Sequence, residues 1–132
     1  MEVRILIIDD DAQVVGSLLD FVEMIGQGMI SCDYAHEVLK AQSLTSANQY
    51  DLIITDFHMP FQNGMSFVKA LRTQSGLNQK TEVIMISGFT GAIEKDIPQI
   101  PKFTLMEKPV CFQTLENRIR SLMTQKPKAV AR

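Results

Sequence analysis

The sequence predicts an α/β domain with a doubly wound parallel sheet of five strands and helices on both faces. Short apolar runs rich in β-branched residues alternate along the chain with segments whose apolar residues recur every three or four positions. Alternation of this kind favours parallel strands joined by right-handed crossovers. The length of 132 residues suits a single domain, and no internal repeat suggests another architecture.

The first strand is expected over residues 3–8, where VRILII is apolar except for Arg4 and ends at Asp9. Asp11 is expected to cap the helix that follows, because an aspartate oxygen can accept from the free amides of the first turn. Apolar residues then recur at helical spacing until Gly26, which is expected to end the helix.

Weaker patterns come next. A second strand is expected over residues 29–35, with alternating side chains at Ile30, Cys32 and Tyr34. Residues 36–48 predict a helix with a narrow apolar face, made of Val38, Leu39, Ala41, Gln42 and Leu44.

The centre of the chain predicts a strand buried on both faces. The apolar run over residues 52–54 is too short for a helix and rich in β-branched side chains, as buried parallel strands are. It stops at Asp56, and loop residues follow until Gly64, near which a helix with Met65, Phe67, Val68 and Leu71 inward is expected to begin. A fourth buried strand over residues 82–86 ends at Ser87.

The least regular segment is 89–100, where Pro98 and Pro101 would stop any helix, so the fourth helix is expected to be short or distorted. A fifth strand over 103–106 precedes Lys108-Pro109, and the last helix has a clear apolar pattern at Phe112, Leu115, Ile119, Leu122 and Met123. The domain is expected to span residues 1–125, with 126–132 as a basic tail or the start of a linker.

Composition narrows the class of protein. A formal net charge of −2 argues against a nucleic-acid-binding surface. Cys32 and Cys111 have no metal-binding or redox spacing, and we interpret them as buried thiols in a reducing compartment, with a disulfide as the alternative. No basic leader with an apolar core and no membrane-length apolar run is present, which leads us to expect a cytoplasmic protein that does not contact membranes.

Functional side chains follow four of the expected strands: Asp9 and Asp10, Asp56, Ser87, and Lys108. The carboxyl ends of parallel strands share one edge of the sheet, where open α/β sheets bind ligands. Three carboxylates gathered there could not all stay ionised without a cation. Mg²⁺ suits oxygen ligands and often joins carboxylates to a phosphate, so the set favours phosphoryl transfer to Asp56.

Over nearly its whole length the chain resembles the receiver domain of two-component response regulators, including the chemotaxis regulators. The motifs that carry the resemblance are Ile7-Ile8-Asp9-Asp10-Asp11, Asp56-Phe57-His58-Met59-Pro60 with Gly64, Ser87-Gly88, and Lys108-Pro109. Each motif alone is weak, but the four together, in order and at strand ends, are specific.

The resemblance implies a flavodoxin-like strand order of 2-1-3-4-5 and a set of roles. Asp56 would be the phosphoacceptor, and Mg²⁺ would be held by Asp9, Asp10, Asp56 and the main-chain carbonyl of His58. Ser87 would hydrogen-bond the phosphoryl group, Lys108 would pair with it, and the Lys108-Pro109 bond would be cis. The partner would be a sensor histidine kinase or phosphotransfer protein, and the domain would catalyse only its own phosphorylation and dephosphorylation.

Two departures from the family pattern stand out. Receivers usually carry Tyr or Phe three residues before the lysine, where this chain has Leu105, so the aromatic half of the usual switch is in question. The prolines of the fourth helical segment also lead us to expect that the symmetric dimer receivers form on that face is altered or absent.

Other functions stay open at this point. A degenerate receiver would bind protein partners without phosphorylation, although the complete set of acids and lysine argues against it. A small aspartyl-phosphate phosphatase or phosphotransferase would need an acid two residues after the nucleophile, where this chain has His58. The sequence identifies neither the kinase nor the output, which a fused or separate domain would provide.

Overall fold

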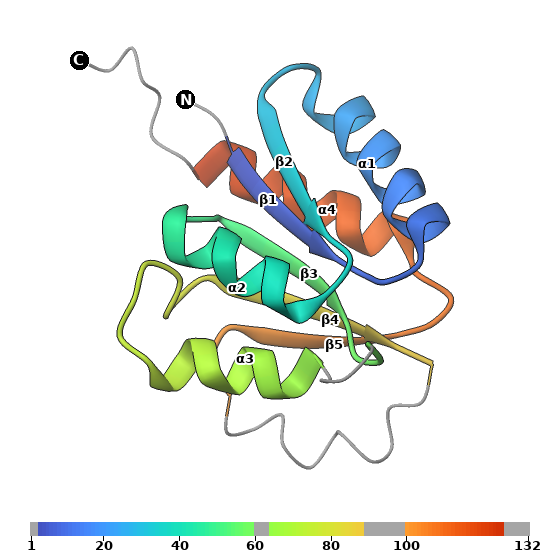
Figure 1. Ribbon diagram of the computed structural model, residues 1–132. Helices are drawn as coiled ribbons and strands as arrows, with labels where there is room; N and C mark the ends of the chain where they lie inside the picture. Colours follow the sequence, from blue (N-terminus) through green and yellow to red (C-terminus); the bar gives the residue numbers. More distant parts are fainter. Residues whose placement is uncertain (1–2, 60–63, 89–99, 126–132) are drawn as a thin grey trace, which may run out of the picture.

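The computed structural model describes residues 3–59, 64–88 and 100–125, and these form a parallel sheet with helices on both sides (Figure 1). The five strands lie in the order β2-β1-β3-β4-β5, as expected. The elements in chain order are β1 (Val3–Ile8), α1 (Ala12–Gly26), β2 (Ile30–Ala35), α2 (Val38–Ala47), β3 (Leu52–Asp56), α3 (Gly64–Thr73), β4 (Glu82–Ser87), β5 (Phe103–Glu107) and α4 (Phe112–Gln125).

Two apolar layers hold the sheet. Helices α1 and α4 cover one face and helices α2 and α3 the other (Figure 1). Alternate residues of the inner strands enter opposite layers: Ile5 and Ile7 of β1 pack toward α1 and α4, and Leu6 and Ile8 pack toward α2 and α3. Because both faces are covered, β1 and β3 show no alternation of apolar and polar residues, and this pattern predicted them from the sequence.

The strand register brings the carboxyl ends of neighbouring strands to one edge. Ile8 of β1 lies beside Thr55 of β3, Asp56 beside Ile86 of β4, and Ser87 beside Glu107 of β5. The residues that end these strands are therefore neighbours across the sheet.

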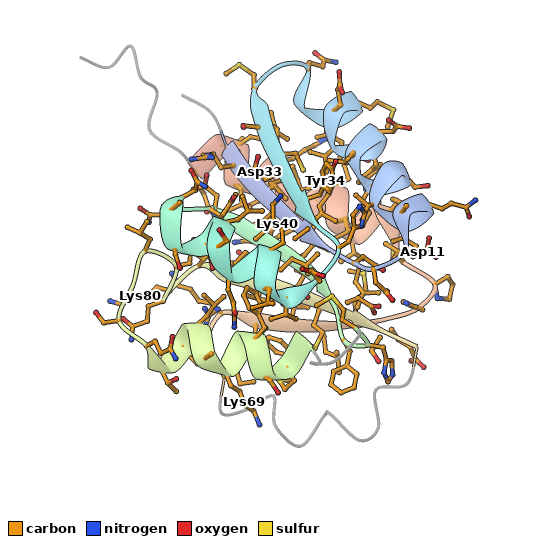
Figure 2. The ribbon with its side chains drawn as sticks, viewed as in Figure 1. Asp11, Asp33, Tyr34, Lys40, Lys69 and Lys80 are labelled. Atoms are coloured by element: carbon orange, nitrogen blue, oxygen red, sulfur yellow. The ribbon has the colours of Figure 1, made fainter. Side chains whose placement is uncertain are left out.

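Most expected element ends agree with the structure within two residues. The Asp11 cap is confirmed, since its carboxylate accepts hydrogen bonds from the main-chain N–H groups of Gln13 and Val14. Figure 2 shows Asp11 where β1 passes into α1, at the functional edge of the sheet.

Two side-chain predictions were wrong. Leu39 does not belong to the buried face of α2: it is 72% exposed, because a helix turns about 100° per residue and the inward positions are Val38, Ala41 and Thr45. Cys111 is an exposed thiol rather than a buried one, since it lies just before the first turn of α4. Cys32 is partly buried, and neither cysteine is in a disulfide.

The fourth helical segment with Pro98, and the tail over 126–132, lie outside the described residues, as does the part of the expected dimer face that this segment would form. Among the helices of the described ranges, none combines the length and apolarity that crossing a bilayer requires.

Candidate functional site

The acids from two neighbouring strands meet at the carboxyl edge of the sheet. Asp9 and Asp10 follow β1, and Asp56 is the last residue of the adjacent β3. Each offers a carboxylate oxygen, and these oxygens all lie within 4.8 Å of one another. Asp9 and Asp56 are buried, whereas Asp10 is exposed. The cluster thus has two buried carboxylates and one that faces solvent.

Asp56 is the acid whose surroundings most clearly favour a bound ligand. Its side chain is 5% exposed, and its buried Oδ1 has no hydrogen-bond partner among the described residues. The nearest opposite charge is Lys108 Nζ, 3.4 Å from Oδ1, on a side chain that is 42% exposed. A buried carboxylate oxygen without a hydrogen bond is costly, and a cation or phosphoryl group can relieve that cost.

Asp9 shows the electrostatic consequence of burying an acid beside two others. Burial raises the pKa of Asp9 from 3.8 to about 6, and the charges of Asp56 and Asp10 add to the increase. The hydrogen bond that the Asp11 N–H donates to Asp9 Oδ1, 2.9 Å long, opposes it, and so does the charge of Lys108. These surroundings therefore disfavour the ionised form of Asp9.

The main chain of Asp9 is also held in place by residues at the end of β2. Its N–H donates to the carbonyl oxygen of Ala35 at 3.0 Å, and its carbonyl oxygen lies 3.0 Å from Nδ1 of His36. No pattern in the sequence predicts this contact of His36, because every residue has a main-chain carbonyl. Its position after β2, beside β1 on the same edge, is the only hint.

The other predicted residues lie around the same edge. Ser87 ends β4 and is fully buried, and its main-chain carbonyl accepts the N–H of Lys108 at 2.9 Å. The Lys108-Pro109 peptide bond is cis, as expected. The side chain of His58 is exposed and stacks edge-on against Phe57, with ring centroids 4.8 Å apart.

Gly64 explains how α3 approaches the site so closely. A Cβ at this position would overlap the main-chain oxygen of Asp56, and the Gly64 N–H donates to the carbonyl of Phe57 at 2.8 Å. Only a residue without a side chain allows α3 to begin directly against the end of β3.

The donor set fits a hard divalent cation. Three carboxylates converge, and one of them has a buried oxygen that is not hydrogen-bonded within the described ranges; in the same ranges, no histidine or thiol ligand belongs to the group. Mg²⁺ prefers oxygen ligands of this kind and keeps several waters, which the exposed side of Asp10 permits.

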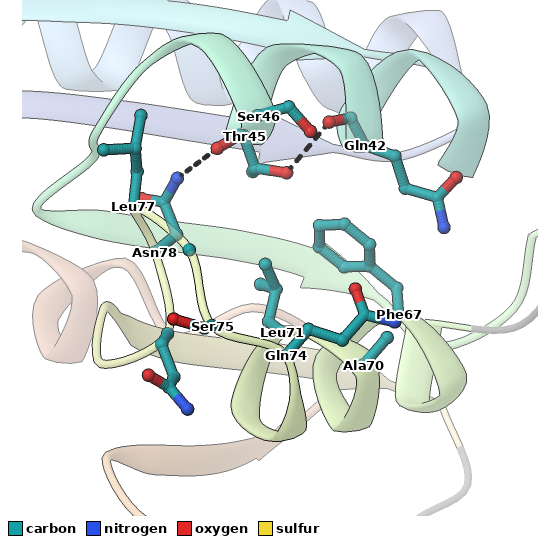
Figure 3. A pocket seen from close by; sticks show the side chains of 12 residues that line it. Gln42, Thr45, Ser46, Phe67, Ala70, Leu71, Gln74, Ser75, Leu77 and Asn78 are labelled. Atoms are coloured by element: carbon teal, nitrogen blue, oxygen red, sulfur yellow. Dashed lines mark hydrogen bonds between the residues drawn. The ribbon is translucent and has the colours of Figure 1, made fainter.

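A concavity lies elsewhere, away from the acidic cluster. About 760 Å³ opens between α2 and α3 and the loop after α3, and Figure 3 shows its lining, including Gln42, Phe67, Leu71 and Asn78. Its lining contains no side chain that is charged at neutral pH and none of the predicted site residues. Size alone does not indicate chemistry here, and the acidic cluster is the better candidate.

Known proteins resemble the chain in sequence. It is 29% identical over 121 residues to the transcriptional regulatory protein CpxR of Escherichia coli, covering 91% of this chain and 49% of the relative. It is 22% identical over 121 residues to the probable chemotaxis protein CheY of Rhizobium etli, covering 92% of each. The chain thus spans about half the length of CpxR and nearly all of the CheY relative.

Solved structures resemble the chain in fold. A CheY-like receiver domain structure from Methylobacillus flagellatus superimposes with a TM-score of 0.78 at 24% identity, covering 92% of this chain and 99% of the other. The family model for the response regulator receiver domain matches residues 5–120, which include Asp9, Asp10, Asp56, Ser87 and Lys108. This chain belongs to the response regulator receiver domain family, the CheY-like modules of two-component signalling.

Proposed function

We propose that the domain accepts a phosphoryl group on Asp56 from a phosphohistidine of a partner kinase or phosphotransfer protein, in a reaction that requires Mg²⁺. The observation that carries the proposal is the state of Asp56 Oδ1. It is buried, lacks a hydrogen bond among the described residues, and lies 3.4 Å from the ammonium group of Lys108. An oxygen in this position is available as a nucleophile toward phosphorus.

The residues around Asp56 suit the charge changes of such a transfer. An Asp56 oxygen would form the bond to phosphorus while the bond from phosphorus to the donor imidazole breaks, and Lys108 would offset the charge of the arriving phosphoryl oxygens. Ser87 is placed at the end of the adjacent strand, as a hydroxyl donor to the phosphoryl group would be.

Asp9, Asp10 and Asp56, with the main-chain carbonyl of His58, would hold the Mg²⁺. When bound, the ion supplies positive charge that offsets the repulsion between carboxylates and phosphoryl oxygens. The raised pKa of Asp9 supports this assignment, because it means that the ionised carboxylate is unfavourable in the protein before any phosphate arrives. A bound cation would relieve that cost.

The output of the signal would depend on a population shift between two conformations of the domain, not on a new fold. CpxR, which is named a transcriptional regulatory protein, is about twice as long as the segment that this chain matches, so a domain fused to the receiver is one candidate for the output. A separate partner is the alternative, as for the CheY relative whose length the chain nearly spans.

A phosphoryl mimic distinguishes this proposal from its competitors. With Mg²⁺ and beryllofluoride, we expect a higher unfolding temperature and altered amide spectra, and no turnover of phosphomonoester substrates. The Asp56→Asn variant should show no response. A protein indifferent to the mimic would be a degenerate receiver, and one that hydrolyses phosphomonoesters would be an enzyme; either result would overturn the proposal.

A further inference from the structure

The two hydrogen bonds from the end of β2 to Asp9 form a clamp on the main chain that carries the acids. Ala35 accepts the Asp9 N–H, and His36 Nδ1 lies 3.0 Å from the Asp9 carbonyl oxygen. A carbonyl oxygen only accepts hydrogen bonds, so Nδ1 of His36 is the donor and carries the hydrogen. Residues 27 positions apart in the chain are joined in this way.

The His36 ring is oriented by a second contact. Its centroid lies 5.2 Å from that of Tyr34 at an interplanar angle of 56°, and Figure 2 shows Tyr34 on β2. The imidazole does not cap the neighbouring helix, since the N-cap of α2 is Glu37, which makes no side-chain cap bond. The contact of His36 with β1 is therefore not explained by the start of α2.

The carbonyl that His36 holds belongs to the peptide plane between Asp9 and Asp10. Because a peptide unit is planar, fixing its oxygen fixes the direction in which the chain leaves Asp9 and enters Asp10. The side chains on both sides of this plane are two of the three clustered carboxylates. Their mutual repulsion favours spreading apart, and the donor on His36 opposes a rotation of the plane that would allow it.

We propose that His36 is a positioning residue for the Mg²⁺ site: its Nδ1–H holds the Asp9-Asp10 peptide plane so that both carboxylates face Asp56 before the ion binds. The inference rests on the proposed function, because it concerns the same cluster. Partners that orient metal ligands from outside the coordination sphere typically change metal affinity about 10- to 100-fold when removed. A hydrogen bond to the main chain of a ligand belongs at the lower end of that range.

Three substitutions separate the donor from the rest of the ring. His36→Ala removes the donor, His36→Asn places an amide nitrogen where Nδ1 was, and His36→Gln moves it one bond farther out. By calorimetric titration, we expect the Ala and Gln variants to bind Mg²⁺ about 10-fold more weakly and the Asn variant to stay within about twofold of the parent. Leu39→Ala, a truncation at an exposed site of α2, is the matched control and should bind as the parent does.

A second readout needs neither metal nor phosphate. The Asp11 amide donates to Asp9 Oδ1, so its hydrogen exchange in metal-free protein reports the order of the acidic loop. We expect exchange of this amide to accelerate in the Ala and Gln variants and to return to the parental rate in the Asn variant. Thermal unfolding of each variant identifies any loss that is merely global.

The outcomes decide the proposal in either direction. Parental Mg²⁺ affinity and parental Asp11 exchange in His36→Ala would overturn it, and so would an Asn variant that folds normally yet behaves as Ala does. If the Ala variant does not fold, the comparison of Asn with Gln decides. A parent that takes up no phosphoryl group would instead remove the proposed function, while the exchange comparison would still settle the role of His36.

Discussion

At the scale of single residues, Asp9 carries an electrostatic cost of assembling the site. Burial and the neighbouring acids raise the pKa of its carboxyl to about 6 in the folded protein, against 3.8 in the unfolded chain. Between these values the native state binds more protons than the unfolded state, so the contribution of Asp9 to stability falls as the pH rises from about 4 to about 6. Above that pH range the ionised carboxylate of Asp9 destabilises the folded protein unless a cation binds beside it.

Replacing this carboxylate should stabilise the metal-free protein. Asp9→Asn keeps an oxygen that can accept from the Asp11 N–H but removes the charge, and we expect a gain on the order of 2 kcal/mol at neutral pH. Urea unfolding in chelator at several pH values measures it. The gain should disappear near pH 4 and be cancelled by Mg²⁺, which only the parent binds well; a gain that is the same at every pH would contradict this origin.

Asn78 is a residue whose side chain stabilises the fold and takes no part in the acidic cluster. It is 1% exposed, its amide nitrogen donates to the carbonyls of Thr45 and Asn48, and its oxygen accepts from the Tyr50 N–H and the Thr81 hydroxyl. Asn78→Ala removes these hydrogen bonds and leaves the buried Tyr50 N–H without its acceptor, whereas the Thr81 hydroxyl can still donate to the Tyr50 carbonyl oxygen. We expect a loss of about 2–4 kcal/mol in the free energy of unfolding. Ser46→Ala, which changes an exposed residue of the same concavity, should cost little by the same urea measurement, and equal losses would refute the account.

At the scale of elements, the start of α3 is fixed by the absence of a side chain at Gly64. In Gly64→Ala the new Cβ overlaps the main-chain oxygen of Asp56, so the helix must move, and we expect a loss of about 1–3 kcal/mol together with slower phosphoryl uptake. Gly16→Ala in α1 is the contrasting substitution: its Cβ meets nothing within 4 Å, and helix propensity predicts a gain of about 1 kcal/mol. Chemical unfolding of both variants tests the pair, which fails if the two changes have the same sign.

The elements also show what a sequence can and cannot predict. Strands β1 and β3 were predictable because burial on both faces leaves uninterrupted apolar runs, and the Asp11 cap was predictable because it is local. Contacts to main-chain carbonyls were not. Arg72 donates to four of them, at Gln79, Thr81, Pro101 and Lys102, tying α3 to the start of β5, and no residue type marks an acceptor that every residue has.

The candidate site was also predictable only in part. The approach of Asp9, Asp10 and Asp56 followed from parallel topology and strand ends, and the structure confirms that they lie together. The chemical roles of Asp56, Ser87, Lys108 and His58 stay predictions, because roles concern a bound ion and a reaction. The exposure of Leu39 and Cys111 was misjudged, since apolar character alone decides neither which side of a helix faces the core nor whether a residue just before a helix is covered.

At the scale of the whole molecule, the two apolar layers form a frame that leaves one edge of the sheet for chemistry. The frame fixes the strands, and the acids and Lys108 follow from where the strands end. Leu105 on β5 packs partly buried against the layer of α2 and α3, where the family usually has an aromatic residue. Leu105 carries no ring, so a change that depends on the swing of an aromatic side chain at this position is not open to this chain.

The most direct test of this account is the mass of the intact protein after incubation with acetyl phosphate and Mg²⁺. We predict the addition of one phosphoryl group to the parent and to Asp20→Asn, an exposed acid on α1, and none to Asp56→Asn or to the parent in excess chelator. Uptake by Asp56→Asn equal to that of the parent, or uptake unaffected by chelator, would contradict the central claim that a cation-dependent cluster of strand-end acids makes Asp56 the phosphoacceptor.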